Sequence, residues 1–239
     1  MSEKKEYFLF DEKLTLKKIS AIRDCRIEKC FVQDALYEQI QAPVAFIDDG
    51  RTAIIETAFS NGFSLIKGKV NYGVTSTYGV GQMIAYAVDL GAKNIILLLG
   101  ESSTNDCGLG MLAALGASFY NQEGIGFVPT GESLSEVSDM DFSAMYPRLQ
   151  GAKFIAIYDM DNPLCGENNY SRTFVQQNGA DKKMVEDLEK GCSHIAHLFN
   201  KMRDSDFSKV RGSGSAGGIA FAVLAGLLGE IHCYEKFKL

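Results

Sequence analysis

Between Glu101 and Asp106, five polar side chains precede an apolar stretch typical of a helix. The group holds two serine hydroxyls, a threonine hydroxyl, a carboxamide and a carboxylate. The free backbone N–H groups at the start of a helix form an anion site, and Ser102, Thr104, Asn105 and Asp106 are candidate ligands or neighbours of that anion. Any one of them can instead cap the helix. Because a cap needs only one side chain, the cluster as a whole favours a binding role.

A second group, Asp159, Asp161 and Asn162, follows the apolar run 154–158. In an extended chain, side chains two residues apart point the same way, so both carboxylates can face one ligand. Mg²⁺ is commonly held by one or two carboxylates together with phosphate oxygens, which makes Asp159 and Asp161 candidate metal ligands. The alternative is an Asp-Asn-Pro turn in which the acids bond their own backbone.

The third segment, 212–218, is rich in glycine and contains Gly212, Gly214, Gly217 and Gly218. Its first six residues match the dinucleotide pattern G-x-G-x-x-G, which needs an apolar strand before it. The preceding residues 207–211 make a poor strand, so a Rossmann dinucleotide site is not predicted, and the sequence contains no P-loop. Two interpretations stay open: a turn whose backbone approaches a phosphate, and a turn that packs tightly against a neighbour.

Metal and thiol chemistry have little support elsewhere. Cys192, His194 and His197 lack a fourth zinc ligand at a sensible spacing. The six cysteines include no C-x-x-C pair, and the charged first residues do not resemble a secretory signal. We therefore expect reduced thiols and a cytoplasmic protein.

Composition excludes several classes of protein. The net charge of −6 and a pI near 5.2 argue against a nucleic-acid partner. The longest charge-free stretch, 212–229, is too short and too rich in Gly and Ser to cross a membrane, so we predict a buried helix there and no membrane partner.

The elements that must position these groups alternate between strand and helix. Residues 43–47 and 52–55 predict a hairpin around Asp48-Asp49-Gly50, and the apolar runs 95–99 and 154–158 predict strands covered on both faces. Helices are predicted over 80–90, with Thr77 as a candidate N-cap, and over 109–115 and 182–202. This order is typical of an α/β domain, in which ligands bind beyond the carboxyl ends of the strands. The first two polar groups follow such ends.

Four segments, taken in order, resemble the type I glycerate kinase family. The segments are Val74-Thr75-Ser76-Thr77-Tyr78-Gly79-Val80-Gly81, Gly100-Glu101-Ser102-Ser103-Thr104-Asn105-Asp106, Asp159-Met160-Asp161-Asn162-Pro163-Leu164-Cys165-Gly166 and Gly212-Ser213-Gly214-Ser215-Ala216-Gly217-Gly218. The likeness extends from about residue 27 to about residue 228. It implies residues 27–239 form a central α/β domain with a mixed sheet flanked by helices, after a divergent segment 1–26.

The resemblance also implies an activity, the transfer of the ATP γ-phosphoryl group to D-glycerate with Mg²⁺. It implies roles for Asp106, Asp159 and Asp161 at the metal or the substrate hydroxyl. Ser102, Thr104, Asn105 and Asn162 would orient the hydroxy acid, and the glycines of 212–218 would approach phosphate.

Some family features have no counterpart in this sequence. Family members have a second, Rossmann-like domain whose motifs we do not find, so we expect a partner half or a homodimer. Glu101 and Cys107 stand where the family has glycine, and Asn178 replaces a lysine. These differences keep a second hypothesis open: a catalytically incomplete ligand-binding or regulatory module of the same fold.

Overall fold

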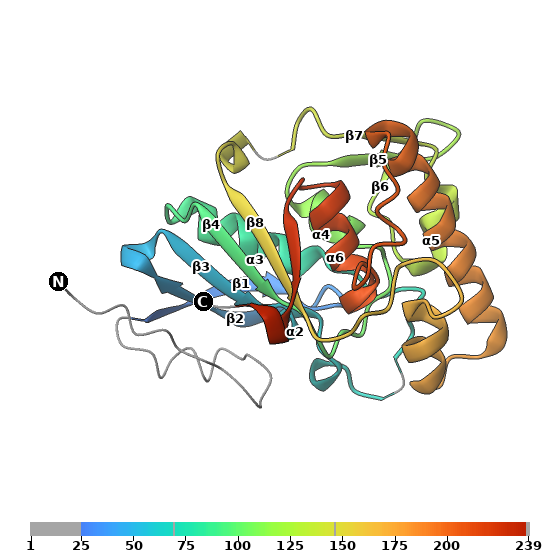
Figure 1. Cartoon of the computed structure of the whole chain (residues 1–239), viewed down its shortest axis with the longest axis horizontal. Helices are drawn as coiled ribbons and strands as arrows, with labels where there is room; N and C mark the ends of the chain where they lie inside the picture. The colour runs from blue at the N-terminus through green and yellow to red at the C-terminus, as the bar shows by residue number, and fades with distance from the viewer. Residues whose placement is uncertain (1–24, 69, 146, 238–239) are drawn as a thin grey trace.

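The centre of the protein is a mixed sheet of six strands. In the computed structural model, which describes residues 25–68, 70–145 and 147–237, the strand order is β1-β2-β3-β4-β8-β9 (Figure 1). The strands are β1 (Arg26–Gln33), β2 (Gln39–Ile47), β3 (Thr52–Glu56), β4 (Asn94–Leu98), β8 (Lys153–Tyr158) and β9 (Glu230–Cys233). Strand β2 is antiparallel to both of its neighbours, β1 and β3, and β3, β4, β8 and β9 run parallel. The predicted α/β class with a mixed sheet is confirmed.

The predicted hairpin joins β2 to β3. Ile47 pairs with Thr52 across the turn, and Asp48–Gly50 form a single 3-10 turn. The Thr52 hydroxyl donates a hydrogen bond to the Asp48 carboxylate at 2.8 Å, which ties the turn to the start of β3.

Strands β4 and β8 are packed on both faces, as their continuous apolar runs predicted. Ile95 and Leu97 of β4 belong to the large core cluster, whereas Ile96 and Leu98 belong to a second cluster on the opposite face. This division follows from the two-residue repeat of a strand, which sends successive side chains to opposite faces.

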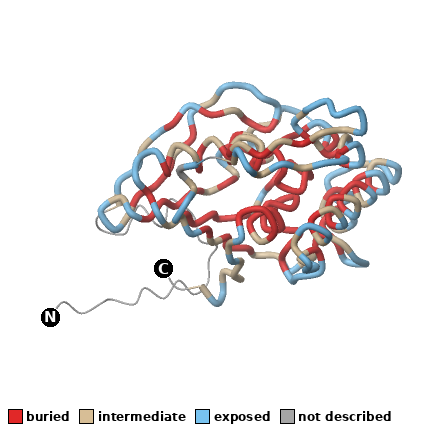
Figure 2. Tube along the Cα trace, turned by 90° about the horizontal axis from the view of Figure 1, so that it is seen from above, coloured by how far each residue is buried: buried red, intermediate tan, exposed pale blue. Residues whose placement is uncertain are grey.

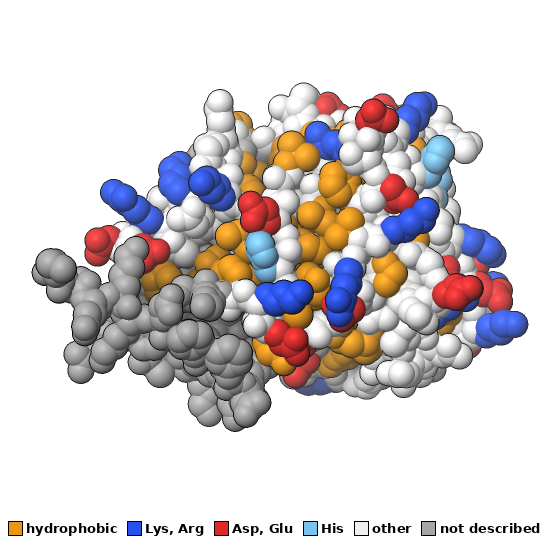
Figure 3. All heavy atoms as spheres, viewed as in Figure 1, with side chains coloured by type: hydrophobic (Ala, Val, Ile, Leu, Met, Phe, Trp, Pro, Cys, Tyr) orange, Lys and Arg blue, Asp and Glu red, His pale blue; other side chains and the backbone are white. Residues whose placement is uncertain are grey.

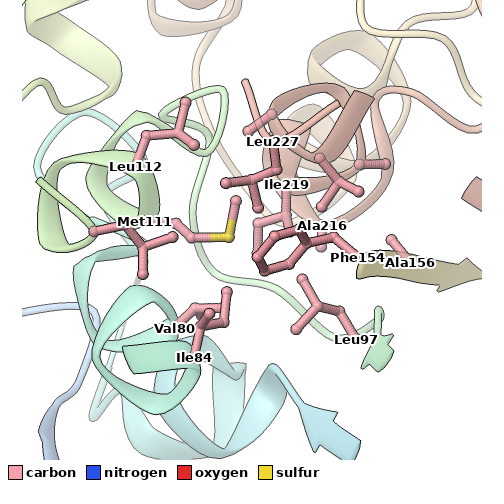
Figure 4. Close-up of a cluster of buried hydrophobic side chains, with 14 of the residues drawn as sticks. Val80, Ile84, Leu97, Met111, Leu112, Phe154, Ala156, Ala216, Ile219 and Leu227 are labelled. Atoms are coloured by element: carbon pink, nitrogen blue, oxygen red, sulfur yellow. The ribbon is translucent and has the colours of Figure 1, made fainter. Parts of the chain in front are cut away.

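The larger helices contribute to the first of these clusters, and Figure 2 marks the buried residues along the chain in red. They are α3 (Tyr78–Asp89), α4 (Leu109–Ala114), α5 (Lys182–Arg203) and α6 (Ser215–Ala225), and a short α2 spans Ala58–Asn61. All three predicted helices are present, and the buried helix expected within 212–229 is α6. Figure 4 shows how the core closes, with Val80 of α3, Met111 of α4 and Ile219 of α6 directed toward Phe154 of β8.

The remaining elements are short. A second sheet has the order β6 (Gly126–Phe127), β5 (Ser118–Tyr120), β7 (Asp139–Asp141). Short 3-10 helices cover Phe63–Leu65, Gly131–Glu136, Pro147–Leu149 and Tyr234–Lys236, and a π-helical turn, η5, covers Ser171–Val175. Among the helices of the described residues, none is both long and apolar enough to cross a membrane.

Candidate functional site

The two polar loops meet at one edge of the sheet. Strands β4 and β8 are parallel neighbours with Leu98 opposite Ile157, so the loops that follow them leave the sheet side by side. The glycine-rich turn before α6 joins them, because the Gly212 N–H donates to the Asp161 carbonyl at 3.0 Å and the Gly214 N–H to the Asn162 carbonyl at 2.9 Å. The placement of the loops at the carboxyl ends of the strands agrees with the prediction.

A cavity of about 220 Å³ opens between these loops. Its walls come from the loop after β4, the loop after β8, the start of α6 and the segment around η5. The lining residues are Phe63, Gly100, Glu101, Ser102, Asp159, Met160, Tyr170, Phe174, Asn178, Ser215 and Ala216. Of the predicted site residues, Ser102 and Asp159 line this cavity, and the other nine do not.

Asp106 lies inside the protein and is fully buried. Its carboxylate accepts hydrogen bonds from the Thr77 N–H (2.7 Å), the Thr77 hydroxyl (2.9 Å), the Gly108 N–H (3.0 Å) and the Gly110 N–H (3.3 Å). Burial raises the pKa of Asp106 from 3.8 to about 6, although these hydrogen bonds lower it. The N–H groups at the start of α4 are therefore occupied by the protein's own carboxylate. Asp106 thus bonds the start of this helix as the capping alternative describes, and a ligand-binding role for the loop stays a prediction.

Thr77 precedes α3 as predicted, but its side chain makes no capping hydrogen bond. The hydroxyl donates to Asp106 and accepts from the Met111 N–H at 2.9 Å. The buried carboxylate is a stronger acceptor than a backbone carbonyl, which explains why the hydroxyl turns away from its own helix. Thr77 thus links α3 to α4.

The hydroxyls of the first loop bond to one another and to Asn61. Ser102 Oγ lies 2.8 Å from Thr104 Oγ1, and the Asn61 amide donates to both at 3.0 and 3.2 Å. The Asn105 amide donates to the Ser171 hydroxyl at 2.7 Å. Sequence reasoning missed Asn61 and Ser171, because they lie 41 and 66 residues away from their partners and no local pattern signals such a pairing.

Asp159 and Asp161 have different neighbours. Asp159 lines the cavity, and its charge contributes to the raised pKa of the buried Tyr170 hydroxyl after the larger effect of burial itself. Asp161 is about half exposed and forms an ion pair with Arg211. The Asn162 amide donates to the Asn168 carbonyl at 2.6 Å and to the Thr173 hydroxyl at 3.1 Å, so it holds the loop against η5.

The glycine-rich turn packs against protein atoms. A Cβ at Gly212, Gly214, Gly217 or Gly218 would lie within 2.6 Å of a neighbouring residue. The shortest of these approaches is at Gly217, where a Cβ would come 1.9 Å from the Thr104 carbonyl oxygen. Tight packing, one of the two alternatives for this segment, is thus present, and the approach of these glycines to phosphate stays a prediction.

Glu101 lines the cavity and has a φ of +49°. This left-handed backbone favours glycine, which is the residue the family motif has here. The Asn178 amide donates to the Phe174 carbonyl at 2.8 Å. Neither departure from the family motif breaks the fold around the cavity.

The described residues contain no group of three or more His, Cys, Asp or Glu side chains that could hold a metal ion. His194 lies 2.6 Å from the Val137 carbonyl oxygen through Nε2, so zinc binding by Cys192, His194 and His197 gains no support. Magnesium needs no such cage, because phosphate oxygens complete its coordination. The face seen in Figure 3 has Lys and Arg side chains interspersed with Asp and Glu.

Comparison with known proteins gives a consistent result. A sequence model of the glycerate kinase family matches residues 15–233. Glycerate kinase of Bacillus cereus (strain ATCC 10987 / NRS 248) is 41% identical over 208 residues, which are 87% of this chain and 55% of that protein. Glycerate 2-kinase of Escherichia coli (strain K12) is 39% identical over 204 residues, which are 84% of this chain and 53% of that protein.

A solved structure agrees. The crystal structure of a candidate glycerate kinase 2 from Salmonella typhimurium LT2 superposes with a TM-score of 0.83 at 31% identity, over 87% of this chain and 56% of that one. The chain spans about half the length of the curated relatives it matches. The extent of the family match, the agreement of the folds and the four motifs in order lead to one conclusion: this chain belongs to the glycerate kinase family.

Proposed function

We propose that the protein transfers the γ-phosphoryl group of ATP to a hydroxyl of D-glycerate, giving phosphoglycerate. One observation carries the proposal: Ser102, Asp159 and the start of α6 surround a cavity at the carboxyl ends of β4 and β8. Its volume of about 220 Å³ suits a small hydroxy acid. The names of the relatives supply the substrate.

Asp159 is the residue we assign to the acceptor hydroxyl. In phosphoryl transfer the protein mainly positions the reactants and a carboxylate accepts the hydroxyl proton. Asp159 lies at the cavity wall, where a bound hydroxyl can reach it. The Ser102 side chain supplies a polar contact on the opposite loop.

The buried members of the predicted set hold the surrounding loops and helices in place. Thr104 bonds Ser102, Asn105 bonds Ser171 in η5, and Asp106 joins α3 to α4. We propose that they are positioning residues, since none is exposed to the cavity. Asn162 fixes the loop that carries Asp159.

ATP and Mg²⁺ are implied by the family. The oxygen donors of Asp159 and Asp161 fit a hard cation such as Mg²⁺, and these two side chains are the ones we assign to it. When bound, the ion neutralises charge on the phosphates.

The activity also needs residues beyond this cavity. The cavity is too small for ATP together with glycerate, and the matched relatives are about twice as long as the matched region. We propose that a second α/β unit, Rossmann-like in the family, or a second copy of the chain completes the site. We place the enzyme in the cytoplasm, a location supported by six cysteines that are all free thiols.

An assay of phosphoglycerate formation from ATP, Mg²⁺ and D-glycerate tests the proposal. It is run on the chain alone and on the chain mixed with the unmatched part of the Bacillus cereus relative. D159N should lower kcat at least 100-fold, whereas D139N, on the exposed strand β7, should not. Absence of product in both formats overturns the proposal.

A regulatory or ligand-binding module is the second candidate. The observation that favours it is the pair of acids, Glu101 and Asp159, in a cavity whose described lining includes no Lys, Arg or His. This function predicts thermal stabilisation by D-glycerate without formation of phosphoglycerate.

A further inference from the structure

One wall of the cavity is aromatic. Phe63, Tyr170 and Phe174 line it, and the ring centroids of Tyr170 and Phe174 lie 5.2 Å apart. Tyr170 is 5% exposed, and it belongs to a cluster of buried side chains that lies behind this wall. A close-packed side chain has little room to change its conformation. The Tyr170 ring therefore sets one boundary of the space that a ligand can fill.

The Tyr170 hydroxyl ties this wall to the loop after β4. It donates a hydrogen bond to the Ser102 backbone carbonyl at 3.1 Å. Ser102 is buried and also lines the cavity, and its side chain is the one to which we assign a polar contact with the substrate. Without the Tyr170 hydroxyl the Ser102 carbonyl loses this donor, which is costly for a buried polar group. Tyr170 thus holds two walls of the cavity at a fixed separation.

The residues on either side of Tyr170 hold its backbone in place. The Asn169 amide donates to the Glu189 carboxylate of α5, and the Ser171 hydroxyl accepts the hydrogen bond from the Asn105 amide at 2.7 Å. Both Asn169 and Ser171 are buried. Three consecutive side chains therefore bond to α5 or to the loop after β4, and the Tyr170 ring cannot swing away from the cavity without breaking such bonds.

We propose that Tyr170 determines the length of the hydroxy acid that this cavity accepts. The proposal rests on the proposed function, since it places the hydroxy acid in the same cavity. Ser102 and Asp159 bind the hydroxyls, and the Tyr170 ring limits the carbon chain to that of D-glycerate. The Tyr170 hydroxyl keeps the ring in this position through its bond to the loop after β4. A homologous acid with one more carbon, such as D-erythronate, then collides with the ring.

A purely structural role makes a different prediction. If Tyr170 only fills the core, Y170F and Y170A lower the melting temperature, but the variants that stay folded keep the wild-type preference between the two acids. If Tyr170 determines the length of the substrate, both variants change that preference. Y170F releases the ring from the Ser102 carbonyl, and Y170A removes the ring.

Calorimetric titration of the full chain with D-glycerate and with D-erythronate, both in the presence of Mg²⁺, distinguishes these roles. Wild type should bind D-glycerate at least about tenfold more tightly, since one additional carbon in a fitted pocket changes affinity about 10- to 200-fold. We expect Y170F to lower this preference by about threefold or more, which is the effect of one lost hydrogen bond, and Y170A to abolish it. Thermal melting of all variants checks that they are folded.

Y72F is the matched control. Tyr72 is a buried tyrosine of the same cluster and is not among the described residues that line the cavity. Its hydroxyl has no hydrogen-bond partner among the residues that the structure describes. Because no hydrogen bond is lost, Y72F should keep both affinities within about twofold of wild type.

The outcomes separate the two proposals. Folded Y170F and Y170A that keep the wild-type preference, or a wild-type chain that binds both acids equally, overturn the role of Tyr170 and leave the kinase proposal intact. If Y170A does not fold, Y170F alone decides. Selective binding of D-glycerate without any phosphoglycerate formation overturns the kinase proposal alone. A wild-type chain that binds neither acid overturns the role of Tyr170, and the activity assay decides the rest.

Discussion

At the scale of the residue, Asp106 has a structural role within a sequence motif of the glycerate kinase family. Its carboxylate accepts N–H bonds from the start of α4 and from Thr77 before α3. These helices pack closely, since a Cβ at Gly81 of α3 would lie 2.3 Å from the Met111 carbonyl oxygen of α4. One carboxylate therefore serves the starts of two helices that no side chain of their own caps.

We expect D106N to lower the free energy of unfolding by about 3 kcal/mol at pH 7, because hydrogen bonds to a charged group contribute about 1.5–3 kcal/mol each and the amide cannot accept them all. Urea unfolding followed by circular dichroism measures this loss. D141N is the control, since Asp141 is exposed on β7, and it should change stability by less than about 0.5 kcal/mol. A D106N protein as stable as wild type contradicts the structural role.

The pH dependence of stability tests the state of the same carboxyl group. The pKa of Asp106 is raised to about 6 by burial, so the folded state binds its proton more tightly than the unfolded state does. The contribution of this group to the free energy of unfolding is fully present below pH 3.8 and is lost as the pH rises through 6. The free energy of unfolding of wild type relative to D106N should rise by about 1.4 kcal/mol between pH 7.5 and pH 5. If this difference in the free energy of unfolding falls between pH 7.5 and pH 5 instead, the pKa of Asp106 is lowered and not raised.

At the scale of the element, the turn that starts α6 shapes the site by close packing. Ala216, Gly217 and Gly218 all have positive φ, so the chain coils in the left-handed sense before the regular helix begins. The Cys107 N–H donates to the Gly217 carbonyl at 3.0 Å. This contact brings the loop after β4 against α6, from a distance of about a hundred residues in sequence.

Replacement of Gly217 by alanine should lower the free energy of unfolding far more than the left-handed backbone at this position alone explains. A Cβ there would lie 1.9 Å from the Thr104 carbonyl oxygen, whereas Gly124 has a similar φ of +76° and nothing within 4 Å of its Cβ position. We expect G124A to lower the free energy of unfolding by about 1–2 kcal/mol, which is the cost of a left-handed backbone for a residue that has a Cβ. G217A should lower it by more than about 3 kcal/mol, because the added Cβ also overlaps its neighbours. Equal losses, measured by thermal unfolding, contradict the packing argument.

At the scale of the whole molecule, α5 closes the core over the site loops. Cys192 of α5 lies 3.4 Å from Cys107, sulfur to sulfur, and both are buried. Burial raises the pKa of the Cys107 thiol well above its ordinary value, and the neighbouring Cys192 raises it further. The Cys107 thiol is thus protonated, and both thiols are shielded from solvent while α5 is in place.

Thiol labelling should therefore report global unfolding. We expect iodoacetamide to modify the partly exposed Cys233 in the native protein, and Cys107 and Cys192 only after unfolding, because thiolate and access are both required. Pulsed labelling across a urea series with peptide mass spectrometry measures this. Rapid labelling of Cys107 in the absence of urea would show that α5 opens on its own.

The sequence by itself determined the elements of this protein and their order. Strands β4 and β8 match the predicted apolar runs 95–99 and 154–158, and α5 matches the helical pattern predicted over 182–202. These elements can be predicted because burial of both faces of a strand, or of one stripe of a helix, produces a recognisable pattern of apolar residues in the sequence. It also placed the polar loops at the carboxyl ends of β4 and β8, since that follows from the alternation of strand and helix.

Only the tertiary structure decided which polar side chains line the cavity and which meet each other. Asp106 faces Thr77, Asn105 faces Ser171 and Asp161 faces Arg211; each pair joins segments far apart in sequence. A hydroxyl or carboxylate has the same chemistry whether it binds a substrate or a neighbour. Its partner is fixed by how the loops pack, and that packing leaves no periodic signal in the sequence.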